Sequence, residues 1–268
     1  MDFCSFSNHI LQHIKISGRA IWLLPKNMCI SPPPPHNLVV GSSLAQRLDS
    51  RILEEHQTFN LAFSGGSALS GLMIIKATAE KTGRLPRRIY VEKNILLMRG
   101  LDEDMLETLF HPLWYRMRDV FPALLEKYQP LNLIYSVLKR YFGKSDEQKA
   151  NEARDERVYN MQLKNFKDSY QQPLQGYEKN LILFQELVAY FESVGVEIVL
   201  FDMPIDNELA YERLPQHQHE ILQTAFPQLH FLQAPNHIEY TTNDGIHLMN
   251  ESALRFTREF VAQMKSYP

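Results

Sequence analysis

The sequence predicts an α/β protein: a three-layer α/β/α sandwich built on a five-stranded parallel sheet, with a helical insertion between the third and fourth strands. Short apolar runs alternate with segments of helical periodicity along most of the chain. This alternation favours a parallel sheet, because crossover helices then cover both of its faces. The runs predicted as strands span residues 37–41, 60–64, 88–94, 196–204 and 229–235.

The predicted domain organisation depends on two interruptions of this rhythm. Four consecutive prolines at 32–35 exclude helix there, so residues 1–36 are predicted as an N-terminal extension and residues 37–268 as one domain. Residues from about 101 to 180 separate the third and fourth strands by far more chain than one crossover helix needs. This segment is the predicted insertion, aromatic-rich in its first half and highly charged, hence predicted as solvated helix, in its second.

The aromatic residues of the insertion allow two interpretations. Trp114, Tyr115 and Tyr135 lie in a stretch of helical spacing, and such stripes usually form the core of a packed helical layer. The alternative is a lid that presents these side chains to a substrate, a membrane surface or a partner protein. The sequence leaves both interpretations open.

Composition and charge restrict the partners and the compartment. The 268 residues carry a formal charge of −3 and an isoelectric point near 6.4, so we expect no nucleic-acid partner, because such binding relies on a basic field. Polar and basic residues interrupt every apolar run of the first thirty residues, which predicts neither a signal peptide nor a membrane span. The default expectation is a cytoplasmic location. The cell envelope or periplasm is the alternative if the sequence is a trimmed piece of a longer one.

Three predicted strands end in residues suited to a catalytic site. The first leads into Gly41-Ser42-Ser43 ahead of a helix-like segment, a position that presents a serine hydroxyl at the carboxyl edge of the sheet. Gly65 follows the second strand, where its backbone N–H could approach a ligand closely. Asn94 ends the third strand and offers a side-chain amide donor. Each residue alone is equally typical of an ordinary turn.

A fourth segment supplies the partners that a nucleophilic serine needs. Asp244 and His247 lie three residues apart, just before the C-terminal helix. Attack by serine requires an imidazole to accept the hydroxyl proton and a carboxylate to hold that imidazole in one tautomer. We found no convincing metal-ligand spacing elsewhere, so no metal or other cofactor is expected.

Together these four segments resemble, in order, the sequence blocks of the SGNH (GDSL-like) hydrolase superfamily. Residues 41–44 resemble the block Gly-Asp-Ser-Leu, which gives Ser43 rather than Ser42 the nucleophile position, and residues 60–65 resemble the block Asn-x-x-x-Ser-Gly. Residues 244–247 match Asp-Gly-x-His in residue type. Residues 92–95 depart from Gly-x-Asn-Asp and keep only the asparagine.

The resemblance implies a flavodoxin-like SGNH fold and a serine-dependent mechanism. In it Ser43 is the nucleophile, His247 its base and Asp244 the orienting acid. The oxyanion hole would comprise the N–H groups of Ser43 and Gly65 with the Asn94 amide. The implied activity is hydrolysis of O-acyl esters, such as short acyl or acetyl esters of small molecules or saccharides, through an acyl-enzyme.

Three alternatives stay open. Serine in place of the family's aspartate at Ser42 is typical of a divergent branch similar to the teichoic-acid D-alanyl transfer protein and to envelope polysaccharide acyl-modifying proteins. That branch includes O-acyltransferases of cell-envelope saccharides as well as esterases. The altered third block also allows a catalytically inactive binding module, and a metal-dependent hydrolase is the most distant possibility.

Overall fold

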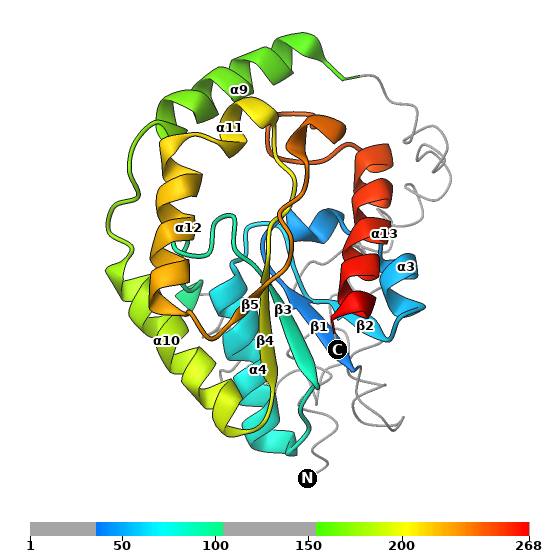
Figure 1. Ribbon diagram of the computed structural model, residues 1–268, viewed down its shortest axis with the longest axis vertical. Coiled ribbons are helices and arrows are strands. Elements are labelled where there is room, and N and C mark those ends of the chain that lie inside the picture. The colour runs from blue at the N-terminus through cyan, green and yellow to red at the C-terminus, as the bar shows by residue number, and fades with distance from the viewer. Residues whose placement is uncertain (1–35, 104–153, 268) are drawn as a thin grey trace, which may run out of the picture.

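The computed structural model describes residues 36–103 and 154–267 (Figure 1). The predicted N-terminal extension, apart from His36, and most of the predicted insertion therefore lie outside the described residues. Within them the elements follow one another as strands alternating with helices, as the sequence predicts.

The sheet has five parallel strands in the order β2-β1-β3-β4-β5, which confirms the predicted fold class. They are β1 (Asn37–Val40), β2 (Thr58–Asn60), β3 (Arg88–Glu92), β4 (Glu197–Phe201) and β5 (His230–Phe231). This is the order of flavodoxin-like doubly wound sheets, in which the chain reverses direction across the sheet between the neighbouring strands β1 and β3. Ligands of open α/β sheets bind outside the carboxyl ends of the strands at such a point.

Alternating side chains of the strands feed two separate hydrophobic cores, because successive residues of a strand point to opposite faces of the sheet. On β1, Leu38 and Val40 join one core and Val39 joins the other. The helices α4 (Ala68–Thr82), α10 (Glu178–Ser193) and most of α12 (Arg213–Ala225) complete the first core. The second contains residues of α3 (Ser50–Glu54), α9 (Glu156–Tyr170), α11 (Asn207–Ala210) and α13 (Asn250–Ser266). The result is the three-layer α/β/α sandwich.

Several elements differ from the prediction, and the strands β3, β4 and β5 are shorter than the predicted runs 88–94, 196–204 and 229–235. The segment after Ser43 is divided into a 3-10 turn at Ala45–Arg47 and helix α3, because the Asp49 carboxylate accepts the N–H groups of Arg51 and Ile52 and so begins a new helix. Strand β2 ends at Asn60, where the predicted strand begins.

Helix α9 belongs to the charged half of the insertion, which is predicted as a solvated helix, and most of its residues are exposed or half-buried. Tyr159, Leu163 and Tyr170 are buried on one side of it, so the helix is amphipathic and packs on the domain. Figure 1 shows α9 crossing the end of the molecule at which the strands finish. The insertion therefore returns to the sheet directly above its carboxyl edge.

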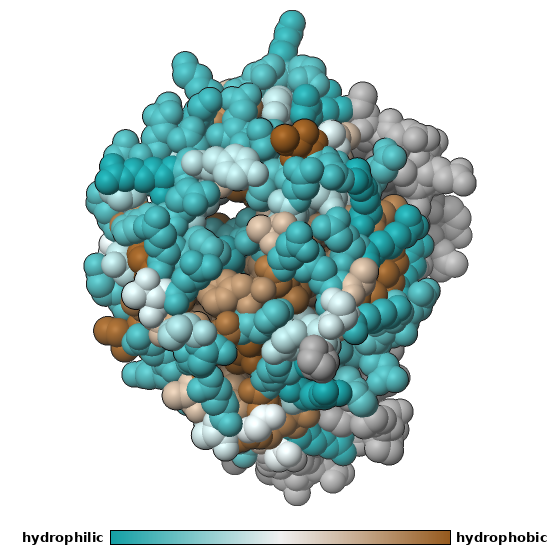
Figure 2. Space-filling model, in the orientation of Figure 1, coloured by the Kyte–Doolittle hydropathy of each residue, from teal (hydrophilic) through white to brown (hydrophobic). Residues whose placement is uncertain are grey.

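The described surface is mostly polar. Figure 2 shows that hydrophobic residues on the viewed face gather mainly near its centre, between α12 and α13, where the surface is hollowed. Among residues 36–103 and 154–267, no helix has the length and apolar character to cross a membrane.

Candidate active site

The predicted triad residues meet at the carboxyl edge of the sheet. The Nε2 atom of His247 lies 2.8 Å from the Ser43 hydroxyl oxygen, and its Nδ1 atom lies 2.6 Å from Oδ2 of Asp244. Ser43 follows β1, at the point where the strand order reverses, and is 204 residues from His247 in sequence. The arrangement is a continuous hydrogen-bonded chain from a hydroxyl through an imidazole to a carboxylate.

The loop that carries Asp244 and His247 is shaped by the Asp244 carboxylate. Its Oδ1 atom accepts the N–H groups of Ile246 and His247 at 3.1 and 2.8 Å, while Oδ2 is paired with the His247 ring. This local turn explains why a three-residue spacing brings the two side chains together.

The same contacts set the charge of Asp244. Burial alone would raise its pKa, but the hydrogen bonds from the His247 ring and from the two N–H groups outweigh burial and lower the pKa below the ordinary aspartate value. An ionised Asp244 can accept a hydrogen bond from the Nδ1–H group of His247, and in that tautomer the unprotonated Nε2 can accept the Ser43 proton.

Two of the predicted oxyanion donors are backbone N–H groups at neighbouring strand ends. Neither the Ser43 N–H nor the Gly65 N–H donates a hydrogen bond within the described part of the chain. Gly65 has a φ of +80°, which favours glycine, and lies on a polar cleft of about 580 Å³ that also contains Ser67 and residues 99–103. Their role as donors stays a prediction.

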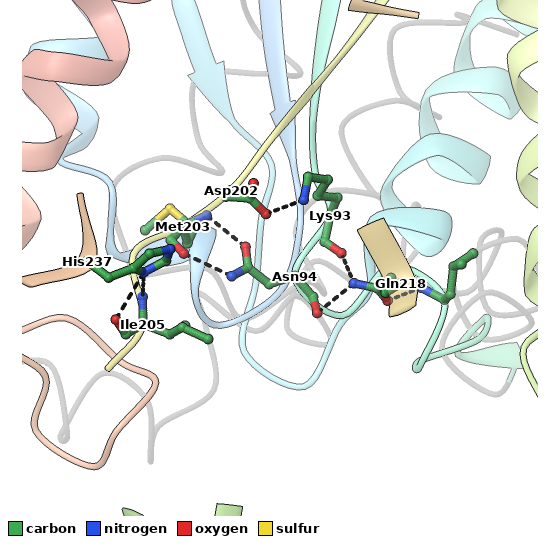
Figure 3. A network of polar contacts seen from close by, with 8 residues as sticks. Lys93, Asn94, Asp202, Met203, Ile205, Gln218 and His237 are labelled. Atoms are coloured by element: carbon green, nitrogen blue, oxygen red, sulfur yellow. Dashed lines mark hydrogen bonds and ion pairs between the residues drawn. The ribbon is translucent and has the colours of Figure 1, made fainter. Parts of the chain in front are cut away.

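Asn94 lies at the carboxyl edge of the sheet, as predicted, but its side-chain amide is already hydrogen-bonded to the backbone of Met203. Its Oδ1 accepts the Met203 N–H at 2.7 Å, and its Nδ2 donates to the Met203 carbonyl at 2.9 Å (Figure 3). The amide thus ties the end of β3 to the segment after β4. Only its second N–H has no partner among the described residues, so any oxyanion contact from Asn94 would have to use that N–H.

Gln218 and an ion pair reinforce the same edge. The buried Gln218 amide donates to the carbonyls of Lys93 and Asn94 and accepts the Leu97 N–H. The Lys93 ammonium pairs with Asp202 at 2.6 Å, and both side chains are largely buried (Figure 3). These contacts hold the residues after β3 and β4 in a fixed geometry at the carboxyl edge of the sheet.

Helix α9 supports the loop that carries Asp244 and His247 through two sets of contacts that the sequence did not reveal. Leu163 packs so closely that a Cβ atom at Gly245 would lie 3.2 Å from its Cδ1. The Tyr159 hydroxyl donates to Asp206 at 2.5 Å, and the Asp206 N–H donates to the Gly245 carbonyl at 2.8 Å. Helix α9 therefore supports the loop that carries Asp244 and His247.

Tyr170, at the end of α9, is a further residue that sequence reasoning missed. It is 5% exposed, and its hydroxyl has no hydrogen-bond partner among the described residues. Burial raises the pKa of Tyr170 to about 12, and the nearby carboxyl groups of Glu92 and Asp244 add to the shift. Tyr170 thus brings a neutral hydroxyl from the insertion close to the site. The predicted substrate contacts Trp114, Tyr115 and Tyr135 lie outside the described residues.

Gly245 provides a test of the bracing by α9. Its φ of +99° disfavours any side chain, and alanine there would also press on Leu163 and Leu209. We expect Gly245→Ala to lower the free energy of unfolding by about 1–3 kcal/mol, and kcat by about tenfold or more, because small displacements of catalytic groups are costly. Chemical denaturation and ester hydrolysis measure the two effects.

Gly83→Ala is the matched control. Gly83 also has a positive φ, of 66°, but it ends α4, and a Cβ atom added there would meet nothing within 4 Å. It should lose stability without a comparable loss of kcat. Equal kcat losses in the two variants would contradict a specific effect on the catalytic loop.

Metal ligation finds no support in the described segments, where no group of three or more histidine, cysteine or acidic side chains is placed to hold an ion. His217 and His219, on α12, contact the rings of Tyr177 and Phe231 respectively.

Compared with known proteins, the chain matches no family model and no curated protein sequence.

Proposed function

We propose that the protein is a serine-dependent hydrolase of O-acyl esters, of the SGNH type. The observation that carries the proposal is the chain of contacts from Ser43 through His247 to Asp244, at 2.8 and 2.6 Å, on the carboxyl edge of a parallel sheet. Its order along the sequence, with serine first and Asp-Gly-x-His last, is similar to that of the superfamily. We infer no requirement for a cofactor in this mechanism.

The chemistry follows from the positions of the atoms. His247 Nε2 takes the hydroxyl proton as Ser43 Oγ attacks the ester carbonyl, whose π electrons move to oxygen. The oxyanion then reforms the carbonyl, the C–O bond to the alcohol breaks, and the departing alkoxide takes the proton from His247. Water attacks the acyl-Ser43 ester in the same way, with His247 again as base, and releases the carboxylic acid.

The N–H groups of Ser43 and Gly65, which have no partner among the described residues, support an oxyanion site in this mechanism. Donors preorganised toward the developing charge are typically worth about 100- to 1000-fold each in turnover. The remaining N–H of Asn94 would add a third donor.

An O-acyltransferase is the second candidate, favoured by the serine at Ser42 in place of the family's aspartate. It would use the same acyl-enzyme but resolve it with a saccharide hydroxyl. An inactive binding module would retain the fold without needing the 2.8 Å contact between Ser43 and His247.

Hydrolysis of p-nitrophenyl acetate, followed with and without added saccharide, tests the proposal. We expect release of p-nitrophenol and of acetate at equal steady-state rates. Acetyl-saccharide formed at the expense of acetate would instead identify the transferase. No turnover of acetyl, butyryl or longer esters, together with no reaction with a fluorophosphonate, would contradict both enzymes and favour the binding module.

A further inference from the structure

Glu92 is a buried acid directly beneath the turn that carries Ser43. It ends β3, is 1% exposed, and lies beside the end of β1, where Val40 pairs with Val91. Its Oε2 atom accepts two hydrogen bonds from Ser42, from the backbone N–H at 2.8 Å and from the hydroxyl at 2.6 Å. Burying a carboxyl group costs free energy unless the group is well hydrogen-bonded. The position of Glu92 therefore suggests a structural or functional role.

These contacts determine which N–H groups of the turn are occupied. Glu92 takes the N–H of Ser42, and the Ser42 hydroxyl oxygen in turn accepts the Leu44 N–H at 3.2 Å. The Ser43 N–H lies between these two and has no partner within the described residues. The turn therefore satisfies both neighbours and leaves free the one N–H that a serine hydrolase would direct at an oxyanion.

The glycine before the turn shows how closely Glu92 fits. A Cβ atom at Gly41 would lie 2.8 Å from the Glu92 Cβ and 3.0 Å from its Oε2. Only glycine allows the backbone to pass this close to the acid. Gly41, Ser42 and Glu92 thus form one structural unit, drawn from two neighbouring strands.

We propose that Glu92 is a positioning residue for the nucleophile, which fixes the Ser42–Leu44 turn so that the Ser43 N–H stays free for the oxyanion. The inference rests on the proposed hydrolase function and extends it to a residue that the SGNH resemblance does not assign. In the third sequence block, Glu92 stands where the family has glycine. On this proposal the glutamate has a structural role there, because Ser42 and Glu92 together provide the hydrogen bonds that hold the turn.

The two hydrogen bonds that Oε2 of Glu92 accepts from Ser42 indicate which substitution should preserve this role, because a charged and a neutral oxygen can both accept them. Burial raises its pKa above the ordinary glutamate value, although the hydrogen bonds from Ser42 oppose the shift. The other oxygen, Oε1, is buried without a hydrogen bond of good geometry in the described chain, although the Ile95 N–H is near enough to favour the ionised form. A neutral acceptor of the same shape should therefore serve.

The variants Glu92→Gln and Glu92→Met distinguish the loss of the hydrogen bonds from Ser42 from a change in side-chain shape. Both side chains are similar in size to glutamate, but only glutamine keeps an oxygen that can accept these bonds. We expect Glu92→Met to lower kcat for p-nitrophenyl acetate about 100-fold with KM changed less than about threefold, and Glu92→Gln to stay within about fivefold of the wild type. Affinity for a boronic acid, which mimics the tetrahedral intermediate, should fall in parallel with kcat. Wild-type kcat in Glu92→Met, or equal losses in both variants, would overturn the proposal.

Glu197→Met controls for loss of a strand carboxylate. Glu197 begins β4, at the opposite end of the sheet, and pairs with Arg88 at 2.6 Å. It should reduce stability but not kcat. If Glu92→Met does not fold, Ser42→Ala carries the test, because it removes the hydroxyl that accepts the Leu44 N–H, and we expect about a tenfold lower kcat.

Amide hydrogen exchange by NMR tests the turn without relying on activity. We expect slow exchange at Ser42 and Leu44, fast exchange at Ser43, and faster exchange at Ser42 in Glu92→Met. Protection of Ser43 equal to that of its neighbours would overturn the proposal even in an active enzyme. Conversely, a wild-type protein without esterase activity but with this exchange pattern would contradict the hydrolase while still supporting the positioning of the turn by Glu92.

Discussion

Ser43→Ala is expected to lower ester hydrolysis by about four to six orders of magnitude. The hydroxyl that this change removes lies 2.8 Å from His247 Nε2 and forms the acyl-enzyme. Losses of this size follow removal of a nucleophile from a serine triad, because the remaining groups contribute only about 10³- to 10⁴-fold over water. The measurement is kcat/KM for p-nitrophenyl acetate, with far-UV circular dichroism to verify folding.

Ser64→Ala is the matched control for Ser43→Ala. Ser64 is an exposed serine one residue before Gly65, in the segment that follows β2, the neighbour of β1, and it has no place in the mechanism. Its removal should change kcat/KM by less than about threefold. Comparable losses in the two variants, or near-normal activity in Ser43→Ala, would show that the nucleophile is another residue.

Asp244→Asn is expected to reduce kcat about 10⁴-fold while leaving the fold intact. Asparagine can still accept the N–H groups of Ile246 and His247 through its oxygen, as Oδ1 of Asp244 does now. Its amide group would face His247 Nδ1 and favour the tautomer with the proton on Nε2, which cannot accept a proton from Ser43. The same substitution in serine proteases has an effect of about this size.

Asp49→Asn distinguishes this electrostatic role from loop capping. Asp49 also accepts two backbone N–H groups, those of Arg51 and Ile52, at the start of α3. Because asparagine is an equally good cap, we expect its kcat and melting temperature to stay close to the wild type. If Asp244→Asn kept more than about a tenth of wild-type kcat, Asp244 would not be the group that orients His247.

The parallel sheet and the meeting of Ser43, Asp244 and His247 could be predicted because their signals are local. Each strand is a short apolar run, and Asp244 shapes its own loop through residues two and three positions away. Ser43 could be chosen as a candidate from its position directly after the first predicted strand. Even the division at Asp49 is visible in the sequence, since an aspartate before Ser-Arg-Ile-Leu-Glu is a typical helix cap.

The partners of the supporting residues could not be predicted because they are set by strand order. Asn94 bonds Met203, which is 109 residues away, and Glu92 bonds Ser42 only because β3 lies beside β1. A glutamate at the position of a family glycine therefore resembled a lost motif. Likewise, the apolar side of α9 is visible in the sequence, but its packing of Leu163 on Gly245 is not.

The central claim is that Ser43 is the nucleophile of an acyl-enzyme mechanism, and covalent labelling tests it most directly. The intact protein would be treated with a fluorophosphonate and the modified peptide mapped by tandem mass spectrometry. We predict one adduct per chain, on Ser43, that is absent from Ser43→Ala and forms much more slowly in His247→Ala. An adduct on Ser64 or Ser67, or no adduct on the folded wild-type protein, would contradict the claim.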